Sequence, residues 1–400
     1  MRILNLTAQK PDSTGSGVFL TELVRGFDAL GHTQAVLCGT TAEDEIHLPD
    51  GVQIYPVFYN SRELPFPVCG MSDEMPYTST RYRDLNGAMT RQLINAFRKA
   101  LERAVEEFKP NVILCHHLYF LAALARQMFP GIPVYGQCHG SDLRQLATNP
   151  WQGDWIKEEI RDLTGIFALH EAQKKQICDI FDLPAHRVTV VGTGYNSSIF
   201  FPDEAEKAAG DSGKFRYIFA GKLSEKKGVH SLLRCLDALE NPRDAEVLLA
   251  GGCGSEEELD KLKAMAEKCP CKVTFLGKLD QKTLAKRMTQ CDVFILPSFY
   301  EGLPLVLIEA MACGLRTICT DLPGIRPWLN RVLPENGTLF VEPPKMRNTD
   351  EPLPESLPDF EKRLARAMDH ARNARLPDPQ QVSALSWDAL CEKLIEIFRR

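Results

Sequence analysis

Short apolar runs alternate along the chain with longer segments in which apolar residues recur every three or four positions. In the first half, the runs predict strands at residues 3–6, 34–38, 52–57, 112–116, 134–137, 166–169 and 188–191. The helical period of apolar positions is clearest at residues 18–30, 93–108 and 171–181. Strands that alternate with helices favour βαβ units and a parallel sheet.

The same pattern begins again after residue 214. It predicts strands at residues 215–220, 246–250, 273–276, 293–296 and 317–319, and helices at 229–239, 256–268, 281–288 and 304–312. Between the two halves, residues 201–214 are small and polar, a composition typical of linkers. We therefore predict two doubly wound α/β domains, at residues 1–196 and 213–385, joined by a hinge at 197–212.

Three segments fall outside this alternation. Residues 59–86 form a long stretch without clear periodicity, and loops of that length are usually functional or disordered. Residues 343–358 carry five prolines and are expected to form a surface excursion. At the end of the chain, Ser386 is a predicted N-cap for an amphipathic helix that runs to Phe398.

Composition places the chain among ordinary globular proteins. Its 400 residues are 44% hydrophobic and 25% charged, and the formal net charge is 47 − 53 = −6, which argues against a nucleic-acid binder. The best candidate for a membrane span, the charge-free stretch of residues 110–125, is too short for one, and the N-terminus has no signal-peptide pattern. An odd number of cysteines, 13, then indicates reduced thiols in the cytoplasm. Cys269 and Cys271 are interpreted as two free thiols.

The strongest functional pattern lies at residues 298–314, directly after a predicted strand. Pro304 suits the first turn of a helix, so Glu301 would lie in the loop before the helix and Glu309 within it. A helix N-terminus favours anionic or hydroxyl-rich ligands, because its first N–H groups have no partner within the helix. The N–H groups expected to face a ligand belong to Gly302, Leu303 and Leu305.

A second pattern, Gly221–Gly228, places three lysines where a predicted strand meets a predicted helix. Lysine is a compact positive charge that suits phosphate. Lys222 and Lys227 flank the turn, where open α/β sheets bind ligands, and are the better phosphate candidates. Lys226 is interpreted as part of a solvated surface.

Weaker patterns follow other predicted strands. Gly15 and Gly17 lie in a glycine-rich first loop that lacks the full dinucleotide-binding fingerprint. His139 begins a glycine turn, and Gly251 lies in a run of three glycines within four residues. Taken alone, each of these patterns indicates only a tight turn.

Together these motifs resemble the retaining glycosyltransferases of family 4, which have the GT-B fold. The resemblance covers nearly the whole chain and is most specific for Glu301 and Glu309, which match the family's paired glutamates, and for the turn Gly221–Gly228, which matches its phosphate motif. It implies two Rossmann-like domains that face a cleft, with the nucleotide-sugar donor mostly on the second domain. It also implies that the C-terminal helix, residues 386–400, packs back on the first.

The resemblance also implies roles for individual residues. Lys222 and Lys227 would contact the donor diphosphate, Glu301 the donor sugar, and Glu309 the ribose. Gly15 and Gly17 would approach the diphosphate and the acceptor, and His139 would face the donor sugar near the reaction centre. The remaining donor-site residues are expected to be Gly251, Leu276, Gly277, Gly302, Leu303, Pro304 and Leu305.

Three positions depart from the family pattern. Lys222 stands where the family usually has arginine, so bidentate contact with a phosphate is lost. Residues 192–196, Gly-Thr-Gly-Tyr-Asn, replace the family's usual Pro-Asn-Gly-Val-Asp. The first loop has Gly-Ser-Gly in place of a double glycine.

The resulting hypothesis is a retaining transferase that uses a nucleotide-diphosphate sugar and neither a metal nor another cofactor. The chain contains no Asp-x-Asp motif. The alternatives are a catalytically silent sugar-nucleotide-binding protein and, ranked last, a hydrolase that uses the two glutamates. The acceptor stays open between a small molecule, a glycan and a lipid-linked sugar, as do the oligomeric state and peripheral contact with the cytoplasmic face of a membrane.

Overall fold

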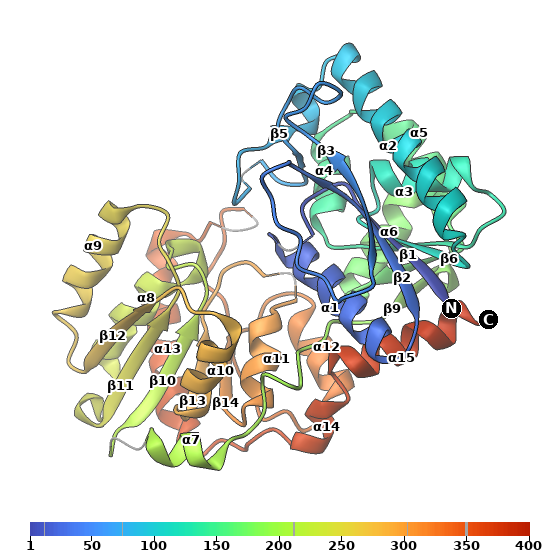
Figure 1. Cartoon of the computed structure of the whole chain (residues 1–400). Coiled ribbons are helices and arrows are strands. Elements are labelled where there is room, and N and C mark those ends of the chain that lie inside the picture. The colour runs from blue at the N-terminus through green and yellow to red at the C-terminus, as the bar shows by residue number, and fades with distance from the viewer. Residues whose placement is uncertain (12, 74, 211–212, 302, 349–350) are drawn as a thin grey trace. The chain divides into compact units, whose positions relative to one another are not determined.

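The computed structural model describes residues 1–400 except 12, 74, 211–212, 302 and 349–350. The chain divides into two compact units. Unit 1 contains residues 1–193 and 390–400, and unit 2 contains residues 194–389. Each unit is an α/β structure built on a parallel sheet (Figure 1).

Unit 1 has a seven-stranded parallel sheet in the order β3-β2-β1-β6-β7-β8-β9. Its strands are β1 (Arg2–Thr7), β2 (Thr33–Thr40), β3 (Gln53–Phe58), β6 (Val112–His116), β7 (Val134–Gln137), β8 (Gly165–Ala168) and β9 (Val188–Val190), with a separate pair β4 (Cys69–Gly70) and β5 (Thr80–Arg81). Its helices are α1 (Gly15–Ala29), α2 (Gly87–Phe108), α3 (Phe120–Met128), α4 (Ser141–Thr148), α5 (Gly153–Arg161) and α6 (Glu171–Phe181).

Unit 2 has a six-stranded parallel sheet in the order β12-β11-β10-β13-β14-β15. Its strands are β10 (Phe215–Ala220), β11 (Ala245–Ala250), β12 (Lys272–Gly277), β13 (Val293–Leu296), β14 (Arg316–Thr320) and β15 (Leu339–Val341). Its helices are α7 (Glu204–Ala209), α8 (Val229–Cys235), α9 (Glu256–Ala266), α10 (Gln281–Thr289), α11 (Leu305–Ala312), α12 (Ile325–Val332), α13 (Leu357–Ala371) and α14 (Pro379–Ser383), and α15 (Trp387–Phe398) leads back to unit 1.

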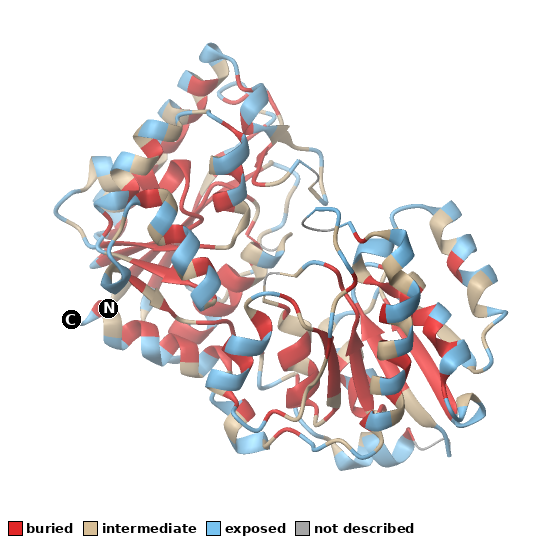
Figure 2. Cartoon of the chain, turned by 180° about the vertical axis from the view of Figure 1, so that it is seen from behind, coloured by how far each residue is buried: buried red, intermediate tan, exposed pale blue. Residues whose placement is uncertain are grey.

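Both sheets are covered on two faces, which confirms the predicted fold class. In each unit the strand order runs outward in one direction and then reverses. Because parallel crossovers are right-handed, helices on the two sides of such a reversal cover opposite faces of the sheet. The central strands are therefore buried along most of their length, and the exposed residues lie on the outer faces of the helices (Figure 2).

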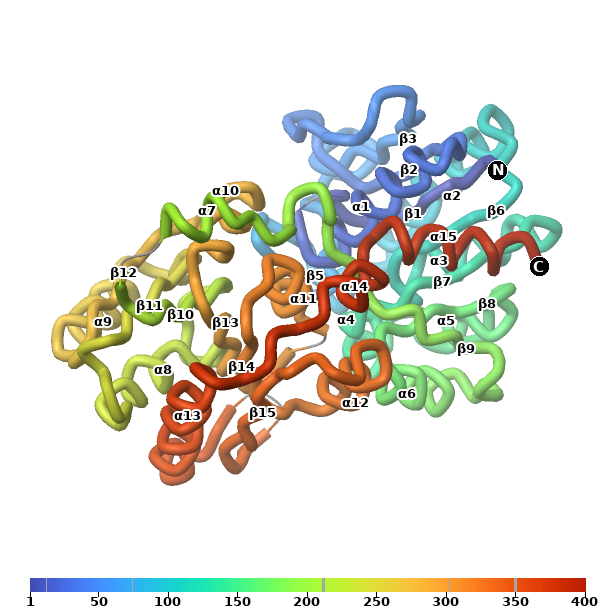
Figure 3. Tube along the Cα trace, turned by 90° about the horizontal axis from the view of Figure 1, so that it is seen from below, coloured from blue at the N-terminus to red at the C-terminus, as the bar shows by residue number. Residues whose placement is uncertain are grey.

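The C-terminal residues complete the core of unit 1. Cys391 Sγ donates a hydrogen bond to the Leu23 carbonyl of α1, at 3.6 Å. The ring of Phe398 lies 6.2 Å from that of Phe27 and 4.9 Å from that of Tyr135. Figure 3 shows the chain trace of α15 ending beside the elements of unit 1. The end of α15 is thus part of the unit whose strands begin the chain, as its amphipathic pattern allowed. In the part of the chain that is described, no helix combines the length and apolarity that crossing a membrane requires.

The polar segment at residues 201–214 is not a plain linker, because part of it forms α7. Asp203 caps this helix by accepting hydrogen bonds from the N–H groups of Ala205 and Glu206. Glu206 in turn bonds to α10, through an ion pair with Lys286 at 2.7 Å. Composition alone does not reveal these tertiary contacts.

Candidate functional site

The carboxyl ends of three neighbouring strands in unit 2 are linked by their backbones. Gly221, after β10, donates a hydrogen bond to the Ala250 carbonyl at 2.9 Å, and Gly251, after β11, donates to the Gly277 carbonyl at 2.7 Å. A side chain at position 251 would collide with the Gly221 carbonyl, so this close approach requires glycine. Open α/β sheets bind their ligands at this edge.

Lys227 and Glu301, both predicted from sequence, are in direct contact. Lys227 Nζ donates to Glu301 Oε1 at 2.7 Å, and Ser298 Oγ donates to the same oxygen at 2.7 Å. The two charged side chains are 32% and 13% exposed. Glu301 Oε2 makes no hydrogen bond to any described residue, so it can accept one from a ligand hydroxyl. The site therefore combines an ammonium group and an oriented carboxylate.

The turn before α8 holds Lys227 in this position. Gly228 has φ +70°, and a Cβ there would overlap the carbonyl of Pro297 at the end of β13. Phe299 donates its backbone N–H to the Lys226 carbonyl at 3.0 Å, which joins the same turn to the segment that carries Glu301. These backbone contacts, between residues about 70 positions apart, fix the spacing of the two charges.

The other predicted donor-site residues of unit 2 lie at the same ends of the strands or at the start of α11. Lys222 follows Gly221, is exposed, and makes no hydrogen bond or ion pair with a described residue. Pro304 is the N-cap of α11, with Leu303 before it and Leu305 as the first helical residue. Glu309 is half-buried in the second turn of α11, and Leu276 and Gly277 end β12. Gly302 lies outside the described residues.

In unit 1 the structure corrects the predicted glycine loop. Gly15 and Gly17 belong to the first turn of α1, which begins three residues earlier than the apolar pattern indicates. The reason is a cap: Thr14 Oγ1 accepts a hydrogen bond from the Gly17 N–H at 3.2 Å. What this segment offers a ligand is therefore a helix N-terminus.

His139 lies in a cluster of three histidines at the ends of β6 and β7. His139 Nε2 is 3.3 Å from His116 Nδ1, and the ring centroids of His139 and His117 are 4.8 Å apart. His117 Nε2 lies 3.0 Å from Ser16 Oγ, which joins the cluster to the start of α1. The cluster thus unites the two predicted features of unit 1.

Burial keeps these histidines uncharged. Burial, together with repulsion from the neighbouring His117, lowers the pKa of His116 to about 3. Burial also lowers the pKa of His117, although Asp142 opposes this, and the pKa of His139, with added repulsion from both other histidines. At neutral pH the three rings therefore act as neutral hydrogen-bonding groups.

Asp142, three residues after His139 in the chain, positions this cluster. Its side chain is fully buried, and Oδ2 accepts hydrogen bonds from the N–H groups of Leu118, at 2.8 Å, and His139, at 3.3 Å. One carboxylate thereby ties the segment after β6 to the segment after β7. No helix was predicted here, and an acidic residue in the first turn of α4 is also common in helices with no such role, so no distinct sequence signal points to Asp142.

Several buried polar atoms at this edge of unit 1 have no partner within the described structure. They are Gln9 Nε2, His116 Nε2, His117 Nδ1 and Gln137 Oε1. Buried polar groups are normally hydrogen-bonded, so such a concentration marks a place where water or a ligand completes the bonding. Among the described residues, no three His, Cys, Asp or Glu side chains are grouped as a metal site would need.

Two family profiles match the chain. One, described as Glycosyltransferase Family 4, matches residues 13–198, and the other, Glycosyl transferases group 1, matches residues 201–349. The chain belongs to the group 1 glycosyltransferases of family 4. A glycogen synthase from Mycobacterium tuberculosis is 22% identical over 343 residues, which is 81% of this chain and 79% of the relative.

Solved structures give the same fold for this family 4 chain. Sucrose-phosphate synthase from Thermosynechococcus elongatus matches with a TM-score of 0.67 at 16% identity, over 100% of this chain and 98% of that one. Anabaena HepE in complex with UDP and glucose matches with a TM-score of 0.63 at 15% identity, over 100% and 99%. At such identities the similarity establishes the GT-B fold of this glycosyltransferase and leaves its substrates open.

Proposed function

We propose that this glycosyltransferase moves a hexosyl group from a nucleoside-diphosphate sugar to a hydroxyl-bearing acceptor, with retention of the anomeric configuration and without a metal ion. The observation that carries the proposal is the contact between Lys227 and Glu301 at the carboxyl ends of the strands of unit 2. An ammonium group can neutralise a diphosphate, and the free carboxylate oxygen beside it can bind a sugar hydroxyl.

The chemistry would depend on electrostatic stabilisation of the departing nucleoside diphosphate. Lys222, Lys227 and the N-terminus of α11 supply positive potential where charge develops as the bond from the anomeric carbon to the phosphate oxygen breaks. These groups can replace a divalent cation in that role. The complex of HepE with UDP and glucose supports a nucleotide-sugar donor for this chain as well.

Unit 1 is the proposed acceptor-binding unit. Its neutral histidines and the unpartnered polar atoms at the ends of β1, β6 and β7 can bind hydroxyl groups. A neutral His139 would meet the donor sugar as a hydrogen-bonding group and would carry no charge.

The test is a transfer assay with UDP-, GDP- and ADP-linked hexoses, carried out with excess chelator, with the first-formed product followed by NMR. We expect transfer to persist in chelator and the product to keep the donor's anomeric configuration. Activity that disappears in chelator and returns with a divalent ion would refute metal independence, and an inverted product would refute retention. Tight donor binding without transfer or hydrolysis would favour a catalytically silent binding protein instead.

A further inference from the structure

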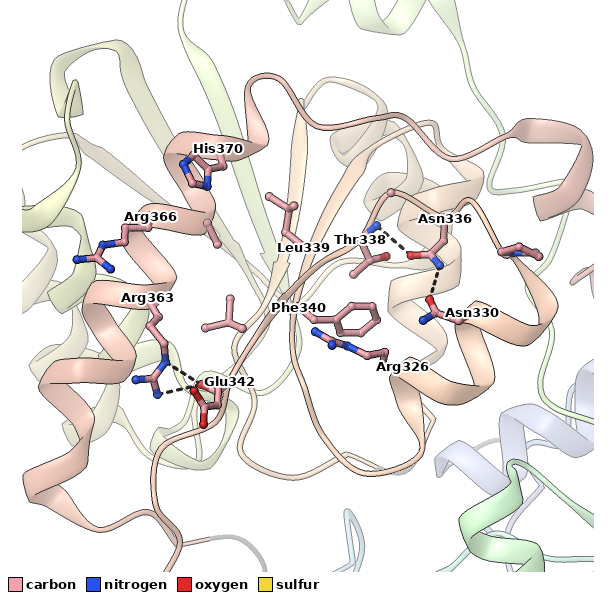
Figure 4. Close-up of a pocket in the computed structure, with 14 residues that line it drawn as sticks. Arg326, Asn330, Asn336, Thr338, Leu339, Phe340, Glu342, Arg363, Arg366 and His370 are labelled. Carbon is pink, nitrogen blue, oxygen red and sulfur yellow. Dashed lines mark hydrogen bonds between the residues drawn. The ribbon is translucent and has the colours of Figure 1, made fainter.

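A cavity of about 670 Å³ opens in unit 2 along the outer side of β15, the last strand of the sheet. Residues 338–342 line it together with side chains from α12 and α13 (Figure 4). None of the residues predicted to bind the donor lines it. Its volume falls in the range of small-molecule sites, roughly 300–1,000 Å³.

Some of the outward backbone groups of β15 are already hydrogen-bonded, so this edge is poorly suited to pairing with another strand. Val341 faces β14, because its carbonyl accepts a hydrogen bond from the Asp321 N–H, so by alternation Thr338, Phe340 and Glu342 present their backbone groups outward. Thr338 N–H already donates to Asn336 Oδ1 at 2.9 Å, and the Glu342 carbonyl already accepts from Arg363 at 3.0 Å. The outward row is therefore partly occupied at both ends, with the Phe340 N–H and carbonyl open between them, which suits a small ligand better than an added strand.

Positive charge dominates the walls of the cavity. Three arginines and His370 line it against one carboxylate, Glu342. Arg326 is paired with Asp321 at 3.1 Å, but among the described residues Arg363 bonds only to the neutral carbonyls of residues 342 and 343. Arg366 makes no hydrogen bond or ion pair with a described residue. Two guanidinium groups one turn apart on α13 thus make no ion pair within the described part of the chain, and guanidinium groups bind phosphate well.

The opposite wall offers neutral hydrogen-bonding groups. Asn330 Oδ1 accepts a hydrogen bond from Asn336 Nδ2 at 3.0 Å, so the Asn330 Nδ2 donors are left for a ligand (Figure 4). Leu339 and Ala367 add apolar surface between the two walls. We propose that this cavity is a second ligand site, separate from the donor site, for a phosphorylated small molecule. Arg363 and Arg366 would bind its phosphate, and Asn330 and the Phe340 backbone would bind its polar, uncharged part.

The test is calorimetric titration of the full chain with inorganic phosphate and with glucose 1-phosphate, and with glucose as the neutral control. Arg366→Ser should weaken phosphate binding by about tenfold or more, since hydrogen bonds to charged groups are among the strong ones. Lys362→Ser also removes one positive charge from α13. Because Lys362 does not line the cavity, this variant should leave phosphate binding unchanged. Lys227→Ala should also keep phosphate binding at the cavity, because Lys227 belongs to the donor site. This expectation does not depend on whether the chain transfers sugars.

Equal affinity in Arg366→Ser and the wild type would overturn the proposal. So would the loss of all phosphate binding in Lys227→Ala, because the phosphate would then belong to the donor site. Glucose 1-phosphate should bind more tightly than inorganic phosphate, and Asn330→Ala should remove this gain. That result would support the role of Asn330 in binding the uncharged part of the ligand. An equal affinity for the two probes would refute that assignment. Unfolding curves of each variant show whether the fold is kept.

Discussion

At the scale of single residues, the structure shows that Lys227 and Glu301, which were predicted separately from the sequence, are bonded to each other. The lysine was expected to bind phosphate and the glutamate to bind sugar, yet neither expectation required the two to touch. Their ion pair fixes both side chains before any ligand arrives, which reduces the entropy lost on binding. It also means that a substitution of either residue changes the orientation of the other.

Lys227→Ala should therefore reduce kcat/KM strongly, by about 10²–10³-fold, which corresponds to the roughly 2.7–4 kcal/mol attributed to a lost contact with developing charge. Lys226→Ala is the matched control, because Lys226 is the neighbouring, exposed lysine of the same turn. Lys222→Arg should keep activity, since related sequences carry arginine there. The measurement is kcat/KM with one donor, and equal losses at positions 226 and 227 would show that the lysines act only as a diffuse field.

Glu301→Gln should separate catalysis from stability. The amide can still accept the hydrogen bond from Ser298 Oγ, so only the ion pair with Lys227 is lost. The free energy of unfolding should change by at most about 1 kcal/mol, as for other partly exposed pairs, while kcat/KM should fall by about tenfold or more. Glu225→Gln, in the turn that carries Lys227, is the control. Wild-type rates for Glu301→Gln at saturating donor would exclude Glu301 from sugar binding.

At the scale of elements, the turn between β10 and α8 is fixed by its contact with the end of β13. Gly228→Ala would combine a left-handed backbone with a collision against the Pro297 carbonyl, and should destabilise unit 2 by about 2–4 kcal/mol. Gly277→Ala is the control, because Gly277 has a similar φ of +69° and open space around its Cβ. It should cost only the roughly 1 kcal/mol of backbone strain. Denaturant unfolding compares the two, and equal costs would show that the collision relaxes.

Secondary structure was predictable where local pattern decides it. The strands of both sheets are apolar runs, and β6, β7, β10 and β13 have the predicted bounds. By contrast, α12 carries a proline in its first turn and β15 has three residues, so neither gives a periodic signal. The N-terminal turn of α1 was missed because a cap at Thr14 outweighs the low helix propensity of two glycines.

At the scale of the whole molecule, acid should destabilise unit 1 selectively. The pKa of His116 falls from 6.5 to about 3 on folding, so between these values the unfolded chain binds more protons than the folded one. Stability contributed by the neutral ring is thus complete above pH 6.5 and is lost as the pH falls toward 3. His117 and His139 shift in the same direction.

Denaturant unfolding at pH 7.5 and pH 5 should show a larger loss for unit 1, reported by Trp151 and Trp155, than for unit 2, reported by Trp328. His116→Gln, which cannot take up a proton, should reduce this loss. Single-tryptophan variants make the two signals separable. An equal pH dependence in His116→Gln and the wild type would show that the histidine cluster does not control the acid response.

The sequence by itself determined the alternation of strands and helices, the restart after residue 214, and the residue types at the ends of the strands. These follow from local apolar periodicity, from glycine turns and from helix-start signals, all of which act within a few residues. Family membership also follows from these motifs, because their order along the chain is specific.

Only the tertiary structure decided which of these residues meet. The ion pair of Lys227 and Glu301, the joining of the segments after β6 and β7 by Asp142, and the cavity beside β15 each unite segments from different strand ends or helices. Such contacts depend on strand order and on the packing of side chains across the sheet, and no local sequence pattern encodes the distance between residues that are far apart in the chain.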